Sequence, residues 1–421
     1  MRKLSIAALW CSCFALASAQ DDNQVKIEVH GFVNHEMMYD TRQVKTAREG
    51  EVLLFPLPEA KDVDGDDKNA AGELSMFNFH TRLQVVMTGP LIGNFKSSAL
   101  IEGDFLGTGD AAPNMVRMRH AFFKLANEKH EWLIGQFWHP MFVTECFPDV
   151  VSWNVALPVH VLNRAPQIRY TYAPFSTLKL SLAAVSQRDF TSYGPKSETD
   201  NTNTASSSYL KRSGVPDFQA QISFKASQNW LMGLTAGYKT LVPRLSTALN
   251  HKADESIGGY NFNVFSKLKT EKATWLVQGI YGQNLSHFLM LGGFAVKDID
   301  AATDKRTYTN IATSSIWTDF AYQASPKIRL GIFAGYVKNN GSSDEVTAFA
   351  SGKPIVFGLG NDIDYMTSIS PRATYAIKRV KFMFEWNNLT AAYGTIQNDL
   401  TVSDTKNVTN NRFLFSSIYS F

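Results

Sequence analysis

The sequence predicts an all-β fold: a transmembrane antiparallel β-barrel of 16 strands, with an inward constriction loop after strand 5. Three observations predict it, namely an export leader, short segments of alternating apolar and polar residues along the whole chain, and an alternating aromatic terminus. Successive side chains of a strand point to opposite faces, so a period of two indicates strands with one apolar face. Such strands are expected to close into a barrel, because an open sheet edge cannot face lipid.

The first residues have the pattern of a secretory signal peptide. Arg2 and Lys3 are positive, residues 4–16 are largely apolar, and a small-residue cleavage site, Ala-Ser-Ala, precedes Gln20. The apolar stretch is too short to cross a membrane as a helix. We therefore predict a signal peptide over residues 1–19 and a single outer-membrane β-barrel domain over residues 20–421.

The composition fits an exported barrel. Cys11 and Cys13 leave with the leader, so the remaining Cys146 cannot form an internal disulfide. Hydrophobic residues make up 44% of the chain, aromatic residues make up 12%, and the net charge is +3. This charge gives no basis for nucleic-acid binding. No linker divides the mature chain, and no apolar run of about 20 residues follows the leader.

Connections between the expected strands alternate between short and long. The short ones follow even-numbered strands, which places these turns and both termini on the periplasmic side. A count of 16 fits best, and 14 or 18 remain alternatives because predicted boundaries err by about 2–4 residues. The expected strands are 25–39, 76–87, 95–105, 115–125, 132–138, 167–172, 178–187, 218–226, 230–240, 257–268, 274–283, 311–324, 328–338, 365–377, 380–389 and a last one from Asn411.

The second expected strand illustrates the alternation. Its apolar residues are predicted to share one face and its polar residues the other. The apolar set is Phe77, Phe79, Leu83, Val85 and Met87, and the polar set is Asn78, His80, Arg82 and Gln84. The stretch before it, residues 40–74, is expected to be a long polar loop.

The last strand carries aromatic residues on alternate positions, interrupted at Ser417. They are Phe413, Phe415, Tyr419 and Phe421. The pattern resembles the closing strand of outer-membrane β-barrels, whose terminal aromatic residue is read by the barrel-assembly machinery. The alternative is an amphipathic edge strand of a soluble sheet.

Residues 139–165 form a long insertion after the fifth expected strand. This segment is rich in proline and aromatic residues, which suits a buried loop better than one in open water. We predict that it folds inward and narrows the barrel; the alternative is a loop packed over the rim or on a neighbouring subunit. Its candidate constriction residues are Pro140, Phe142, Glu145, Asp149 and Trp153.

Charged residues of both signs are expected to line the interior, because an arginine on the lipid face at mid-depth costs about 2–4 kcal/mol. The candidates are Arg82, Glu102, Asp104, Arg117, Arg119, Arg164, Arg169 and Arg372. The arginines form either a basic ladder that attracts anions or wall pairs with the acidic residues. We expect pairing for Arg117, beside the acidic strand. Free positive charge is expected at Arg82, Arg164, Arg169 and Arg372.

Three short motifs carry a family resemblance: Glu102-Gly103-Asp104-Phe105, then Arg117-Met118-Arg119-His120-Ala121-Phe122, then Gly135-Gln136-Phe137-Trp138 with Phe142. In this order and spacing they resemble the core of DcaP-type outer-membrane porins of Gram-negative bacteria. The resemblance covers a small part of the chain.

The resemblance implies a sixteen-stranded, trimeric channel that favours small anionic solutes such as dicarboxylates. By position, Arg117 and Arg119 would line the lumen, and the segment after Trp138 would form the constriction. The chain departs from the family in lacking an N-terminal coiled-coil extension. Any trimer stabilisation by such an extension is therefore not expected.

Two weaker patterns concern metals. Asp62, Asp64, Asp66 and Glu73 match the acidic positions of an EF-hand loop, but Asp67 stands where that loop needs its glycine. Whether these residues bind calcium stays open. The histidines His80, His120, His139 and His160 show no ligand spacing, and we predict no metal site among them.

Enzyme motifs are not evident. No nucleophile elbow, zinc-protease, P-loop or dinucleotide signature occurs in a strand–turn–helix context. Cys146 would need a positioned base, and His139 is the nearest candidate. We therefore predict no catalysis and no cofactor.

The sequence thus favours a porin of the cell outer membrane that passes small hydrophilic solutes by passive diffusion, with a mild preference for anions. Expected partners are membrane lipid, lipopolysaccharide, the barrel-assembly machinery through Phe421, and two further copies in a homotrimer. A non-conducting surface barrel, such as an adhesin or structural protein, and an outer-membrane barrel enzyme are the alternatives.

Overall fold

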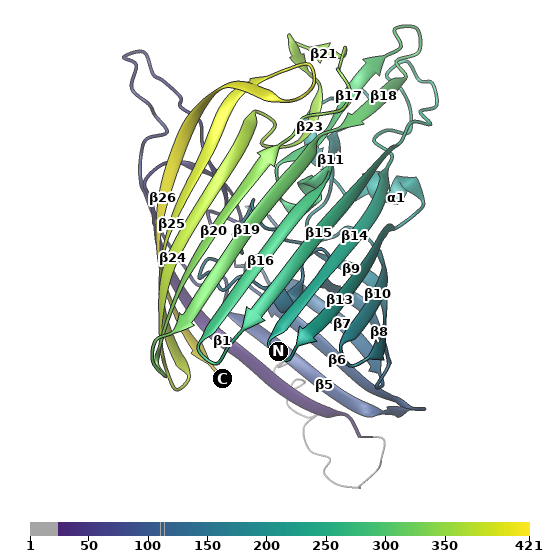
Figure 1. The fold of residues 1–421 in the computed structure, drawn as a ribbon. Helices are drawn as coiled ribbons and strands as arrows, with labels where there is room; N and C mark the ends of the chain where they lie inside the picture. The colour runs from purple at the N-terminus through teal and green to yellow at the C-terminus, as the bar shows by residue number, and fades with distance from the viewer. Residues whose placement is uncertain (1–23, 110, 113) are drawn as a thin grey trace, which may run out of the picture.

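A computed structural model describes residues 24–109, 111–112 and 114–421. The predicted signal peptide lies outside the described residues. Long tilted strands run antiparallel around a closed wall, and the last strand returns to the first (Figure 1). Among the described residues, no helix is long and apolar enough to cross a bilayer.

The wall is built from strands in sequence order, each paired with its neighbours. They are β1 (Lys26–Asp40), β4 (Glu73–Phe77), β5 (Arg82–Ile92), β6 (Phe95–Asp104), β7 (Arg117–Ala126), β8 (His130–Trp138), β9 (Arg164–Phe175), β10 (Leu178–Val185), β13 (Asp217–Ser227), β14 (Trp230–Leu241), β15 (Ile257–Lys269), β16 (Ala273–Gln283), β19 (Ala312–Gln323), β20 (Ile328–Asn339), β24 (Ile363–Ile377), β25 (Val380–Ile396) and β26 (Val402–Ser420).

The wall contains 16 strand positions, because β4 and β5 pair one after the other with β1 and form two halves of one strand. Closure comes from β1 and β26, whose register sets Tyr39 opposite Phe413 and Val33 opposite Tyr419. Every barrel edge is thereby paired, as a lipid-facing sheet requires. The predicted 16-stranded all-β barrel is confirmed.

The break between β4 and β5 corrects one prediction. At the break the chain turns, and the Thr81 N–H donates to the Asn78 carbonyl oxygen at 3.0 Å. The turn reverses the alternation before Arg82, so Phe77 and Phe79 are buried while Asn78 is exposed. The prediction that these two phenylalanines share a face with Leu83 is therefore wrong.

The terminal strand follows the predicted alternation. Phe413, Phe415 and Tyr419 are exposed on the outer face of β26, whereas Leu414 and Ile418 are buried. The last residue, Phe421, exchanges backbone hydrogen bonds with Gly31 on β1 at 3.0 and 3.3 Å. The chain therefore ends on the closing seam of the barrel.

The long loop after β1 is not the open polar loop predicted for residues 40–74. It contains a hairpin, β2 (Val44–Ala47) and β3 (Val52–Pro56), whose Leu53 is buried. The apolar residues of β3 explain the difference, because they pack against residues 139–163 inside the barrel.

Further short elements lie in the other long connections. They are η1 (Thr144–Cys146), β11 (Tyr193–Pro195), β12 (Asn203–Ala205), α1 (Ser208–Ser213), η2 (Leu285–Phe288), β17 (Gly292–Ile299), β18 (Arg306–Asn310), β21 (Phe349–Ala350), β22 (Lys353–Pro354) and β23 (Val356–Leu359). Strands β17, β18 and β23 form a small sheet above one rim (Figure 1).

Candidate functional site

Residues 139–163, between β8 and β9, form an inward loop that crosses the interior. Met141 and Phe142 are buried at its start, in one apolar cluster with the wall residues Trp317 and Phe333. The same cluster contains Leu53 of the long connection between β1 and β4, which we call the first loop. Loop residues that are buried against interior wall side chains place the segment inside the barrel, where the sequence predicted it.

Two buried carboxylates of the wall hold this inward loop. Asp319 Oδ2 on β19 accepts the Asp149 N–H at 2.8 Å. Glu385 on β25 accepts the N–H groups of Val151 and Ser152 at 2.7 and 3.3 Å. A carboxylate that accepts backbone N–H groups in a buried place forms strong charge-assisted hydrogen bonds, so these bonds fix the middle of the loop.

Arg372 on β24 completes this anchor and corrects a prediction. Its guanidinium donates to both oxygens of Asp319 at 2.7 and 3.0 Å and lies 3.5 Å from Asp149. The prediction of a free positive charge at Arg372 is wrong. Its acidic partner lies on another strand, 53 residues away in sequence, and sequence spacing gives no sign of that pairing.

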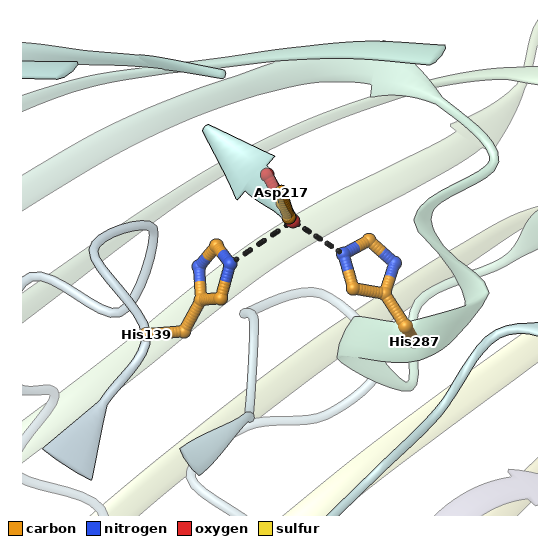
Figure 2. Close-up of side chains that lie close together, drawn as sticks. All are labelled: His139, Asp217 and His287. Carbon is orange, nitrogen blue, oxygen red and sulfur yellow. Dashed lines mark hydrogen bonds and ion pairs between the residues drawn. The ribbon is translucent and has the colours of Figure 1, made fainter. Parts of the chain in front are cut away.

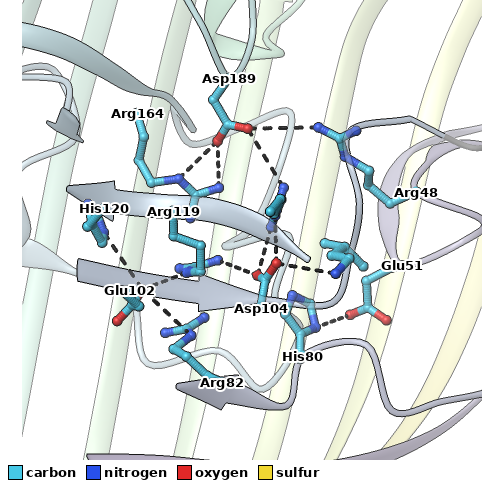
Figure 3. A network of polar contacts seen from close by, with 12 residues as sticks. Arg48, Glu51, His80, Arg82, Glu102, Asp104, Arg119, His120, Arg164 and Asp189 are labelled. Carbon is cyan, nitrogen blue, oxygen red and sulfur yellow. Dashed lines mark hydrogen bonds and ion pairs between the residues drawn. The ribbon is translucent and has the colours of Figure 1, made fainter. Parts of the chain in front are cut away.

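A second charged group lies on another part of the wall, on β5, β6 and β7. Arg117 donates to both oxygens of Asp104 at 2.7 and 3.0 Å, and Arg119 bonds to Glu102 at 2.6 Å and to Asp104 at 3.0 Å. Arg117 is therefore a wall pair, as predicted, and Arg119 is one as well. Figure 3 shows Arg119 and Arg82 on either side of Glu102.

Arg164, at the start of β9, is also paired. Its Nε and Nη2 donate to Asp189 Oδ2 at 2.9 and 2.6 Å, so the predicted free charge at this position is wrong. Burial alone would raise the pKa of Asp189, but the guanidinium groups of Arg164 and Arg117 outweigh it and hold that pKa below its ordinary value. Asp189 lies in a connecting loop and was missed, because nothing in its sequence context marks it.

Arg82 differs from the other arginines of this wall. Its guanidinium lies 5.1 and 5.0 Å from the ring centroids of Phe32 and Trp153, which stack on each other at 5.6 Å. The nearest carboxylate oxygen, on Glu102, is 3.7 Å away, too far for a hydrogen bond. Its Nε and Nη2 are buried and have no hydrogen-bond partner.

We call Arg82, Arg117, Arg119 and Arg164 the basic cluster. Its four guanidinium groups meet three carboxylates, Glu102, Asp104 and Asp189, so the formal charge of these seven residues is +4 − 3 = +1. Arg48 adds a further positive charge 3.8 Å from Asp189. The cluster lines a cavity of about 160 Å³, together with Trp138 and Trp153. Unpartnered N–H groups of Arg82 and Arg164 lie buried at this cavity, so the chemistry it offers is that of an anion site.

Arg169 lies apart from the basic cluster. Its side chain donates to Gln167 Oε1 and to the Trp138 carbonyl oxygen and covers the ring of Phe137. It lines a separate cavity of about 320 Å³, beside Lys124 and the short turn between β7 and β8. The sequence placed Arg169 with the other arginines; the structure does not.

The predicted constriction residues lie along the inward loop at different points. The Pro140 carbonyl oxygen accepts from Gln221, and the ring of Phe142 stacks on Trp138 at 3.9 Å. Glu145 is exposed at η1, where its carbonyl oxygen accepts from Lys267. The Asp149 N–H donates to Asp319, and the ring of Trp153 lies 5.0 Å from the Arg82 guanidinium.

His139 is part of a buried group that sequence spacing did not reveal. Its Nε2 lies 3.3 Å from Asp217 Oδ2, and His287 Nε2 lies 3.8 Å from the same oxygen (Figure 2). The three residues come from the start of the inward loop, from β13 and from η2. Their donor atoms lie within 4.8 Å of one another, a spacing compatible with a metal ion.

The contacts of Nδ1 in His139 and in His287 indicate that each neutral ring carries its proton on Nε2. His139 Nδ1 accepts the Met141 N–H at 3.2 Å, and His287 Nδ1 lies 2.6 Å from the Lys239 amino group. Histidines that bind metal normally donate from the second nitrogen to an acceptor. Here the second nitrogens face donors, so His139 suits donation from Nε2 to Asp217, whereas His287 Nε2 is too far from the carboxylate for a hydrogen bond. We interpret the group as a structural contact.

The remaining histidines lie elsewhere. His80 Nδ1 lies 2.8 Å from Glu51 of the long connection after β1 (Figure 3). The same nitrogen lies 3.4 Å from Glu36 on β1, so His80 joins this connection to the wall. His120 packs against Phe137 and Trp138. His160, in the inward loop, packs on Phe142, and burial lowers its pKa to about 3.

The acidic segment considered for calcium forms a tight turn. Asp62 Oδ1 accepts the N–H groups of Asp64 and Asp66, both at 2.9 Å, and Glu73 belongs to β4. The groups with metal-ligand spacing among the described residues do not include this segment.

Cys146 lies buried in η1, packed against Val143 and Phe265. Burial raises the pKa of its thiol to about 12, so the thiol stays protonated at neutral pH. We expect maleimide to leave Cys146 unlabelled in the folded protein at pH 7 and to label it fully in denaturant. Rapid labelling of the folded protein would show that the inward loop opens.

Comparisons with known proteins identify the fold. No protein-family model and no curated protein sequence matches the chain. Among solved structures, the outer membrane channel DcaP of Acinetobacter baumannii matches with a TM-score of 0.68 and 18% identity, over 96% of this chain and 100% of that chain. The chain has the porin fold.

Two further porin-fold structures match. The anion-selective porin from Comamonas acidovorans has a TM-score of 0.54 and 9% identity, over 94% of this chain and 100% of that chain. The trimer form of OmpT from Vibrio cholerae has a TM-score of 0.53 and 11% identity, over 94% and 99%. The expected DcaP-type or general porin architecture is thus confirmed at the level of the fold.

Proposed function

We propose that this protein is an outer-membrane porin through which small hydrophilic solutes diffuse passively, with a preference for anions. The observation that carries the anion preference is the cavity of the basic cluster. Guanidinium N–H groups of Arg82 and Arg164 lie there without hydrogen-bond partners, and the cluster holds one more positive than negative group. An oxyanion in the cavity would supply the missing acceptors.

The route past this cavity is narrow because the inward loop and the first loop both occupy the interior. Trp138 and Trp153 line the cavity beside the arginines. Charge at a narrow point acts strongly on permeating ions, since low-dielectric walls focus the field. The loops would therefore limit the size of the solutes that pass, and the arginines would determine the preference for anions.

The barrel would insert into the cell outer membrane, with its aromatic outer face in lipid and with lipopolysaccharide around its outer rim. Phe421, exposed at the end of the closing strand, would be the residue read by the barrel-assembly machinery. We propose a homotrimer as the working assembly. Neither catalysis nor a cofactor is part of this proposal.

A non-conducting surface barrel is the second candidate, and a specific observation favours it. Residues of the first loop, the inward loop and η2 form one continuous apolar cluster inside the barrel, including Leu53, Phe142 and Phe288. A packed interior of this kind would close the lumen if it were rigid. The two hypotheses make opposite predictions for conductance.

The deciding experiment is single-channel recording in a planar bilayer, with the reversal potential measured under a salt gradient. We expect steady openings and a reversal potential that favours chloride over potassium. A correctly folded barrel without openings would reject the porin hypothesis in favour of the surface barrel. Openings without anion preference would reject the role of the basic cluster in selectivity but would keep the porin hypothesis.

A further inference from the structure

Three buried side chains meet where the first loop touches the wall. Glu36 lies on β1, Glu51 lies in the turn just before β3, and His80 lies in the turn between β4 and β5. Each of the three residues is at most 2% exposed. Figure 3 shows the ring of His80 turned toward the carboxylate of Glu51. We call these three residues the Glu–Glu–His cluster.

The ligand atoms of this cluster have the spacing of a metal site. His80 Nδ1 lies 2.8 Å from Glu51 Oε1 and 3.4 Å from Glu36 Oε2. One ligand atom of each residue lies within 4.8 Å of the other two. Tetrahedral Zn²⁺ with bonds of about 2.0–2.2 Å separates its ligand atoms by about 3.3–3.6 Å. The three side chains would therefore need only small adjustments to hold an ion between them.

Two carboxylate oxygens of the cluster lack hydrogen-bond partners. Glu36 Oε1 and Glu51 Oε2 are buried, and no described residue donates to either of them. A buried polar atom without a partner is unfavourable. The imidazole cannot supply both carboxylates, because Nδ1 carries at most one proton. The cluster therefore offers more acceptors than its own donors can satisfy, and a cation would use them.

The charges around the cluster leave an excess of the same sign. Two arginines interact electrostatically with Glu51, namely Arg412 and Arg117. Each of them already donates to both oxygens of an aspartate, Asp40 and Asp104 respectively. The two carboxylates of the cluster carry two negative charges, and the imidazole carries at most one positive charge. A divalent cation beside a neutral imidazole makes the group neutral, and buried charges need such compensation.

The other buried histidine group, His139, Asp217 and His287, differs from this cluster. Its Nδ1 atoms face donors, and the second oxygen of Asp217 accepts from Gln219 at 2.6 Å. In the Glu–Glu–His cluster, Nδ1 itself faces two carboxylates. Zinc accepts imidazole and carboxylate ligands, and three protein ligands leave its fourth position to water.

We propose that Glu36, Glu51 and His80 bind one Zn²⁺ ion, which fastens the first loop to the barrel wall. Residues 52–54 follow Glu51 directly and are buried in one apolar cluster with the inward loop. An ion that holds Glu51 would thus hold the inner end of the first loop. The sequence predicted no metal at His80, because Glu36 lies 44 residues away in the chain.

The surrounding structure positions all three ligands. At Glu36, β1 is paired with strands on both sides. Arg412 donates at 3.0 Å to the carbonyl oxygen of Gly50, which precedes the loop glutamate. The ring centroid of His80 lies 4.6 Å from that of Trp153, and His80 lines the cavity of about 160 Å³. Ligands held by their neighbours bind metal more tightly, and the cavity gives the ion a route of entry.

Calorimetric titration with ZnCl₂ tests the site in the folded barrel, held in detergent without a histidine tag and freed of metal by a chelator. We expect one Zn²⁺ per chain. Glu51→Gln and His80→Gln should each weaken binding at least about tenfold. Glu59→Gln, at an exposed glutamate of the same loop, is the matched control and should leave binding unchanged. A wild-type chain that binds no zinc would overturn the proposal, as would equal affinity in all variants.

Two readouts on the wild-type chain keep the proposal testable if a variant fails to fold. Co²⁺ in place of zinc should give the intense visible absorption of a tetrahedral site, and an octahedral spectrum would overturn the assigned ligands. Zinc should also slow amide hydrogen exchange of residues 52–54 at least about tenfold, because exchange reports local opening. Unchanged exchange in the zinc-bound protein would reject the fastening role. Neither readout uses conductance, so a silent barrel would reject the porin function and leave this inference standing.

Discussion

Replacing Arg82 by glutamine is expected to lower the anion-to-cation permeability ratio about fifteenfold at low salt, because the charge attracts anions and repels cations by the same energy, about fourfold for each. One unit charge acts on an ion about 5 Å away with about 0.8 kcal/mol in water, and about 1.4 kcal/mol corresponds to a factor of ten. Arg82 is the arginine of the basic cluster that lacks a close carboxylate partner, so its charge is the least neutralised. The reversal potential under a salt gradient measures the change.

Arg82→Glu extends this test, because the charge changes by two units. The ratio should then fall by about a hundredfold or more, with larger effects at lower ionic strength. Arg379→Gln is the matched control, since Arg379 is exposed in the short turn between β24 and β25. If Arg82→Gln and Arg379→Gln shift the reversal potential equally, the basic cluster does not set selectivity.

Removing the charge of Asp319 is expected to destabilise the barrel and to loosen the inward loop. Asp319→Asn leaves the guanidinium of Arg372 buried without its bidentate partner and weakens the acceptor for the Asp149 N–H. Breaking one side of a buried ion pair costs about 3–5 kcal/mol. Urea unfolding followed by tryptophan fluorescence measures the stability, and single-channel noise reports the loop.

A double variant separates these two effects. Asp319→Leu with Arg372→Met replaces the ion pair by apolar side chains and should recover much of the stability, because apolar replacement of a buried pair is often neutral. Leucine offers no acceptor to the loop backbone, so the channel noise should remain. A quiet channel in the double variant would show that the other contacts of the loop, among them Glu385 and the ion pair of Arg329 with Asp149, hold it without Asp319.

The barrel itself could be predicted from the sequence because alternation is a local property. Each strand reports its two faces through its own residues, and the terminal aromatics Phe413, Phe415 and Tyr419 lie on the outer face as expected. The inward position of the loop after β8 was also predictable. Its dense apolar residues cannot remain in water, and they are buried in the structure.

The candidate site could be predicted only in part. The sequence identified the arginines, and it paired Arg117 correctly because the acidic strand is adjacent. It failed for Arg164 and Arg372, whose partners lie 25 and 53 residues away. The residues around an arginine in the sequence do not predict which carboxylate a distant strand or loop will place next to it.

The sequence by itself therefore determined the strand faces, the barrel and its inward loop. Only the tertiary structure decided which charges remain unpaired, because pairing depends on register across the wall. It also decided that a turn after Phe77 sends Asn78 outward beside His35, where strict alternation had placed it inside. A shift of one residue exchanges the inward and outward side chains of a strand. The position of such a shift depends on the strands that pair with it, which the local sequence does not specify.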